Sequence, residues 1–299
     1  MVIYRIRRFS MGLDVTIRQK GFRKKTMPLD VILGSELHYG DFFCDHIIKD
    51  QLGDFEFIAY HPEHIGRGFS VAWNPAEKKR IDLRLPFPTT PAEFSDFFET
   101  VRRISTYWNS TLEVDGNKVA LAEFLSELDN MIEFNKKHIQ HCANDVLEDD
   151  KEDGHLTFMS VMHPLNMGKE EAALFIKDNN AFCNWLHEKQ CVDADYDTPR
   201  FFFENDEIVG RYSYVNGRPH LFAGKPSVPF GVVDTDTGLA IECDCWKMEV
   251  FSDKDTQVAE LDYSEFLSRI PKEKVQRHDA HLLLIAPLSD EEFSKLIQS

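Results

Sequence analysis

Residues 80–108, RIDLRLPFPTTPAEFSDFFETVRRISTYW, constrain the fold most, because they join an alternating strand to a helix with a strong start signal. Thr90 can act as the N-cap, Pro91 suits the first turn, and Glu93 can complete a capping box. Apolar side chains then recur at helical spacing, so we expect one helix face to pack against a sheet; they are Phe94, Phe97, Phe98, Val101, Ile104 and Trp108. A cofactor groove along this stripe is the less favoured alternative.

Strand patterns surround this helix. FIAY and FSVAW indicate two strands before it, and after it an Asp-Gly pair at 115–116 predicts a hairpin turn ahead of a long helix over residues 121–146. These patterns predict an α+β fold, with antiparallel or mixed β-sheets packed by amphipathic helices.

The second half of the chain repeats these patterns. HLTFMSV is strand-like, and residues 168–190 predict one or two helices. Residues 200–222 predict aromatic strands joined by two hairpin turns, and residues 228–251 a strand pair around the DTDTG turn. The chain closes with a strand and a helix whose capping box is Ser289 and Glu292. This ending resembles residues 81–99, and a duplication of two related halves is one explanation.

The acidic run LEDDKEDG at residues 147–154 is the best candidate for a domain boundary. We therefore expect two sub-domains, residues 11–150 and 151–299, with one compact unit as the alternative. Residues 1–10 are expected to be a leader or an extension from an upstream start, because the strand-like segment begins just after Met11.

Charge and cysteine content narrow the functional classes. The 299-residue chain carries a formal net charge of −17, although its first 25 residues hold eight Lys or Arg against Asp14 alone. So acidic a chain is expected to avoid nucleic acids and membranes and to attract another protein, with a basic one favoured. The six cysteines show no disulfide-framework spacing, and no apolar signal core is present, which predicts reduced thiols in the cytoplasm.

The polar loop in FIAYHPEHIGRGFSVAWNP holds the best candidates for ligand binding: His61, Glu63, His64 and Arg67. Flexible glycines on both sides of Arg67 could let its guanidinium and the backbone amides approach an anion together. A turn between strands with a solvated arginine is the favoured alternative. Neither the zincin motif nor the zinc deaminase motif fits the histidine spacing here.

A second candidate site lies in the long helix, where His138, His141 and Asp145 share one face and could hold a divalent metal. The alternative is that these three residues belong to the solvated polar face of an amphipathic helix, since no fourth ligand follows from the spacing. The chain lacks a dinucleotide loop, a P-loop, a nucleophile elbow and a C-x-x-C pair, so we expect no cofactor, and no complete catalytic constellation is present.

Several stretches of the chain form a recognisable set: LHYG, FIAYHPEHIGRGFSVAWNP, GKEEAALF, WLHEKQ, PRFF, VPFG and TGLAIECDCW. Together they resemble an uncharacterised bacterial family of about this length, a domain of unknown function found mainly in Gram-positive bacteria. The resemblance covers nearly the whole chain from Met11 and implies a bacterial, intracellular setting without an assigned activity.

The sequence therefore favours an acidic cytoplasmic protein that binds or regulates another protein. The alternative is an enzyme or a small-anion-binding protein that uses the loop of His61, Glu63, His64 and Arg67.

Overall fold

The structure, a computed structural model, describes residues 11–43, 45–76, 78–151, 154–229, 232–233, 241–253 and 256–298, without the side chains of Phe43 and Asn179. Residues 1–10, which the sequence predicts to be a leader, lie outside this set. The chain forms two compact units that meet in the sequence between Cys191 and Val192. We call them the N-terminal and the C-terminal unit.

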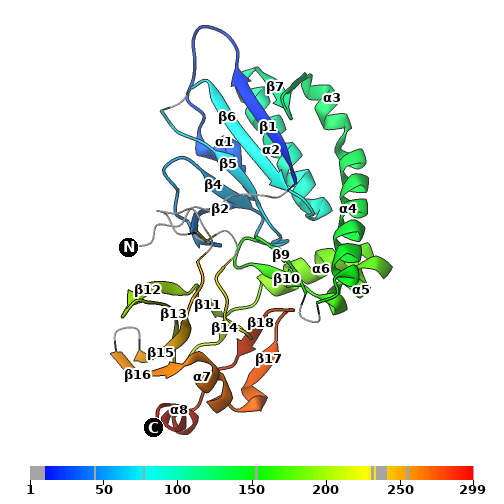
Figure 1. Cartoon of the computed structure of the whole chain (residues 1–299). Helices are drawn as coiled ribbons and strands as arrows, with labels where there is room; N and C mark the ends of the chain where they lie inside the picture. The colour runs from blue at the N-terminus through cyan, green and yellow to red at the C-terminus, as the bar shows by residue number, and fades with distance from the viewer. Residues whose placement is uncertain are drawn as a thin grey trace. The chain divides into compact units, whose positions relative to one another are not determined.

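The N-terminal unit is built on an antiparallel sheet with the strand order β3-β2-β4-β5-β6-β1-β7-β8 (Figure 1). Its strands are β1 (Gly12–Gln19), β2 (His38–Phe43), β3 (His46–Lys49), β4 (Phe57–Tyr60), β5 (Phe69–Ala72), β6 (Arg80–Pro86), β7 (Ser110–Val114) and β8 (Asn117–Val119). The helices along this stretch of chain are α1 (Leu29–Leu33), α2 (Pro91–Trp108) and α3 (Leu121–Ser126).

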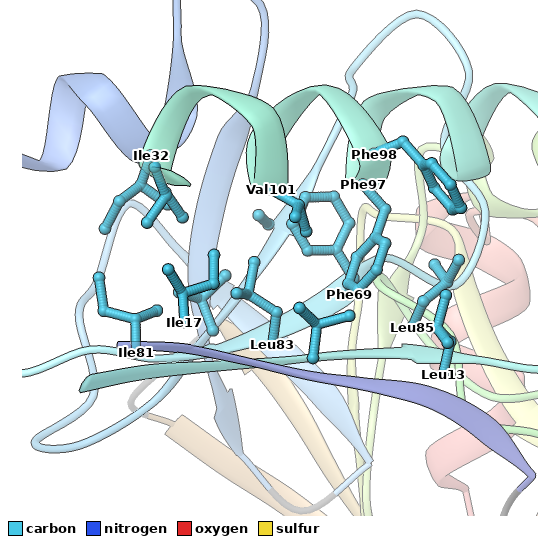
Figure 2. Packing of buried hydrophobic residues seen from close by; sticks show 14 of the residues in the cluster. Leu13, Ile17, Ile32, Phe69, Ile81, Leu83, Leu85, Phe97, Phe98 and Val101 are labelled. Atoms are coloured by element: carbon cyan, nitrogen blue, oxygen red, sulfur yellow. The ribbon is translucent and has the colours of Figure 1, made fainter. Parts of the chain in front are cut away.

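Helix α2 lies over this sheet and buries its apolar stripe against it (Figure 2). Val15, Ile17 and Leu83 project from β1 and β6 towards the helix because alternate residues of a strand face the same side. The ring of Phe97 on α2 meets that of Phe69 on β5 edge to face, with centroids 5.4 Å apart. The predicted capping box of Thr90 and Glu93 is confirmed, and the stripe is core.

The predicted second helix is two helices, α3 and α4 (Leu128–Glu148), which meet at Glu127. The far half of α4 packs on β9 (Leu156–Phe158), β10 (Leu165–Met167), α5 (Lys169–Lys177) and α6 (Asn179–Gln190). Ile139, Cys142 and Val146 of α4 share a core with Phe175 and Phe182 there. This shared core places residues 151–191 in the N-terminal unit, so the break comes later in the chain than the acidic run.

The described residues of the C-terminal unit form two four-stranded sheets, ordered β12-β13-β15-β16 and β11-β14-β18-β17. The strands are β11 (Asp195–Tyr196), β12 (Arg200–Glu204), β13 (Glu207–Val215), β14 (His220–Ala223), β15 (Cys245–Asp253), β16 (Thr256–Asp262), β17 (Val275–Arg277) and β18 (Leu282–Ile285). Helices α7 (Tyr263–Arg269) and α8 (Asp290–Ile297) and the 3-10 helix η1 (Lys272–Lys274) complete it. Tyr214, Met248 and Phe266 lie at its core.

The pairing of these strands corrects part of the sequence interpretation. The turn at Asn205-Asp206 does join a hairpin, β12–β13, but the turn at Asn216-Gly217 does not, because β13 and β14 belong to different sheets. β13 instead pairs in parallel with β15. The predicted DTDTG turn lies outside the described residues. Antiparallel and mixed sheets packed by helices confirm the α+β class.

Phe97→Ala should lower the free energy of unfolding of the N-terminal unit by about 3–5 kcal/mol, because it opens a cavity beneath α2. Chemical denaturation followed by circular dichroism measures this change. Phe22→Ala is the matched control, since the Phe22 ring is fully exposed, and it should leave the midpoint unchanged. Equal stability of the two variants would contradict the packing of α2 on the sheet.

Candidate functional site

The loop between β4 and β5 divides the four candidate residues between the interior and the surface. Arg67 is only 7% exposed, and its guanidinium donates hydrogen bonds to the backbone oxygens of Met159 (2.9 Å), Phe87 (2.8 Å) and Pro88 (3.1 Å). Burial lowers the pKa of Arg67 to about 10, and the nearby Glu93 carboxylate opposes that shift. The predicted solvated turn is therefore wrong for Arg67, which is buried and donates from Nε and Nη1 to the protein's own backbone.

The carboxylate of Glu93, the third residue of α2, binds the loop between β4 and β5 on its buried side. Glu93 is 2% exposed and accepts hydrogen bonds from the backbone N–H of Gly68 and from the Thr89 hydroxyl. A side chain at Gly66 would collide with the same carboxylate. Gly68 has a φ of +64°, a conformation that favours glycine. Gly66 and Gly68 therefore allow the loop to lie close to the N-terminal cap of α2.

His61 and His64 form the outer half of the loop. Their rings are stacked, with centroids 3.8 Å apart and planes 15° apart. Nε2 of His64 lies 2.8 Å from the Asp96 carboxylate of α2, and Nε2 of His61 lies 3.9 Å from the Glu36 carboxylate. Asp96 and Glu36 are distant in sequence, so spacing gave no sign of either contact.

The histidine pair has the geometry of oriented imidazoles. The backbone N–H of Glu63 donates to Nδ1 of His61 at 3.1 Å, so a neutral His61 carries its proton on Nε2, towards Glu36. Asp96 orients His64 in the way that a carboxylate orients a catalytic histidine. The Glu63 side chain is exposed. The arrangement can exchange protons.

The residues of the predicted metal site lie on α4 as expected, with the rings of His138 and His141 6.4 Å apart. His141 lies 3.6 Å from Asp145, whereas Nε2 of His138 lies 3.7 Å from the Cys142 sulfur. Burial lowers the pKa of His138 and raises that of Cys142 to about 11. Across the part of the chain that the structure describes, no group of three or more His, Cys, Asp or Glu is arranged to hold a metal.

A carboxylate-rich surface, which the sequence analysis did not single out, adjoins the histidine pair. Residues 36–63 contain seven Asp or Glu and one cationic residue, Lys49. We call the acidic edge the group of Glu36, Asp41, Asp50, Asp54, Glu56 and Glu63, which are exposed or half-buried around β2, β3 and β4. Counting charge in this window of the sequence, instead of over the whole chain, would have found it.

Three apolar side chains are exposed within the acidic edge. Ile48 on β3 pairs with Asp41 on β2, and Leu52 and Phe55 lie in the loop that follows. This loop runs close to β2, because a side chain added at Gly53 would collide with the Asp41 carboxylate. Phe55 is 72% exposed. Apolar side chains grouped on a surface and rimmed by charge are typical of protein interfaces.

A family model described as a domain of unknown function (DUF4299) matches residues 12–296. Neither a curated protein nor a solved structure matches the chain. Among the described residues, no helix combines the length and the apolar character needed to cross a membrane.

Arg67→Ala should destabilise the N-terminal unit by about 3–5 kcal/mol, because it removes the cation beside the buried Glu93 and leaves three carbonyls without their donor. Thermal and chemical denaturation measure the loss. Arg23→Ala, at an exposed arginine, is the control and should have the wild-type midpoint. A stable Arg67→Ala protein would show that Arg67 does not support the loop from inside.

Proposed function

Because the chain belongs to the DUF4299 family, whose description assigns no activity, we propose from the geometry that it is a protein-binding or regulatory module. Its partner offers a basic segment with apolar side chains, and that segment docks on the acidic edge. The observation that carries the proposal is the exposure of Ile48, Leu52 and Phe55 within a group of carboxylates.

The two kinds of side chain have separate roles in such an interface. Carboxylates on the edge attract a basic segment over a distance and speed its association. Phe55, the most exposed of the three apolar residues, supplies the contact area that stabilises the complex once water is excluded. His61 and His64 adjoin this surface through Glu36 and Glu63.

The same charge disfavours other partners at this surface. The carboxylates repel the phosphates of nucleic acids and of anionic lipids, so neither is the ligand of the acidic edge. The proposed setting is the cytoplasm, where the net charge of −17 favours basic proteins.

Capture experiments with matched variants test this proposal. The wild-type chain should retain a stoichiometric protein from a lysate of its own cells at low salt and release it at high salt. Phe55→Ala should weaken the complex by about tenfold or more, and the double variant Asp54→Lys, Glu63→Lys should abolish capture.

The control is Glu123→Lys, Glu148→Lys, which changes the net charge equally at exposed positions of α3 and α4. It should retain the captured protein. Capture that survives the edge variants, or that is lost equally in the control, would mean that the acidic edge is not the binding surface.

The hydrogen bond between His64 and Asp96 favours a second candidate function, an enzyme with acid–base chemistry at the histidine pair. Arg67 is not assigned a role in it, since its Nε and Nη1 donate to backbone oxygens of the protein itself. Incubation with a metabolite extract, followed by mass spectrometry, should then show depletion of one compound by the wild type and by His187→Gln. His64→Gln and Asp96→Asn should both fail; depletion by either would exclude this chemistry.

A further inference from the structure

Basic residues from two distant segments gather at one end of the sheet of the N-terminal unit. The loop after β1 and the loop before β6 meet there, because Arg18 on β1 is paired with Arg80 on β6. We call this group the basic tip: Arg18, Lys20, Arg23, Lys24, Lys25, Lys78, Lys79 and Arg80. In Figure 1 the first loop runs from the end of β1 to α1, beyond the end of the sheet. An acidic chain thus carries a strongly cationic surface.

One glutamine side chain joins the two loops. Nε2 of Gln19 donates to the backbone oxygens of Lys25 and Lys78, each at 2.8 Å, and its Oε1 accepts from the Lys25 N–H at 2.8 Å. Its own backbone N–H donates to the Lys79 oxygen at 3.0 Å. The indole of Trp108 donates to the Lys25 oxygen as well, at 3.1 Å. The backbone of both loops is therefore fixed at the residues that carry these cations.

Few carboxylates neutralise this surface. Arg18 pairs with Glu113 and Arg80 with Asp82. Within the described part of the chain, Lys20, Arg23 and Lys78 form no ion pair, and all three are exposed. Glu77 belongs to the second loop in the sequence but lies outside the described residues. The tip thus keeps a local positive charge in spite of the net charge of the chain.

An aromatic side chain stands in the middle of these cations. Phe22 follows Gly21, whose φ is +82°, and its ring is 106% exposed. A phenyl ring left wholly in water among lysines and arginines has no role in the folding of the unit. Rings flanked by basic residues can enter the boundary between lipid headgroups and acyl chains while the cations bind the headgroups.

We propose that the basic tip binds an anionic lipid surface, with Phe22 inserted and the surrounding lysines and arginines on the headgroups. A projecting loop with one exposed aromatic residue suits a flat surface. Single-stranded nucleic acid is less favoured, because it needs a groove with several stacking rings, and the indoles of Trp73 and Trp108 donate inward to the backbone. Repulsion from the acidic remainder is screened beyond about 8 Å at physiological salt.

Vesicle co-sedimentation with the full chain tests this proposal. The protein should pellet with vesicles of phosphatidylcholine and phosphatidylserine at physiological salt, where repulsion from the acidic remainder is screened, and stay in solution with phosphatidylcholine alone. The triple variant Lys20→Glu, Arg23→Glu, Lys78→Glu should lower partitioning by on the order of 100-fold or more. The triple variant Lys137→Glu, Lys151→Glu, Lys177→Glu changes the net charge equally at exposed positions away from the tip and should bind like the wild type.

A spectroscopic readout reports insertion directly. In Phe22→Trp, the tryptophan emission left after subtraction of the wild-type spectrum, which comes from four native tryptophans, should shift to shorter wavelength only with the anionic vesicles. The absence of vesicle binding, equal loss in both triple variants, or binding without the emission shift would each overturn the proposal. Retention of a single-stranded oligonucleotide in place of vesicles, lost in the tip variant, would overturn it in favour of nucleic acid.

Discussion

The buried carboxylate of Glu93 is the interaction on which the N-terminal unit depends most. It completes the cap of α2 and accepts a hydrogen bond from the loop that follows β4. Thr89, which donates to it, also exchanges two hydrogen bonds with Asn135 of α4, at 2.9 and 2.7 Å. A buried charge is costly unless it is fully hydrogen-bonded, so these partners have little freedom to move. The loop between β4 and β5 and the helices α2 and α4 are thereby fixed at one point.

The contacts of Glu93 also determine where the histidine pair lies. Asp96 lies one turn of α2 after Glu93, and the loop that Glu93 holds presents His64 to it. A change that loosens the cap would therefore move the imidazole away from its carboxylate as well. Arg67 contributes from the other side, where its three bonds to backbone oxygens hold the loop against the residues before α2 and before β10.

The sequence predicts those features that depend on neighbouring residues. The caps at Thr90 and Ser289 and the stripe of α2 follow from spacings of three and four residues, and all are found in the structure. Pairing between distant strands does not follow from such patterns, which is why the parallel pair of β13 and β15 was missed. Asp96 and Glu36 were missed for the same reason, and the inward direction of Arg67 depends on carbonyls from three later residues.

The position of Gln19 has a consequence for comparing relatives of this chain. Its uncharged amide decides where the lysines of two loops lie, so the electrostatic surface depends on a residue that carries no charge. Two family members with the same composition and isoelectric point could therefore present different potentials at this end of the sheet. When family members are compared for a cationic surface at this end of the sheet, the identity of residue 19 should therefore be considered together with the number of lysines in the two loops.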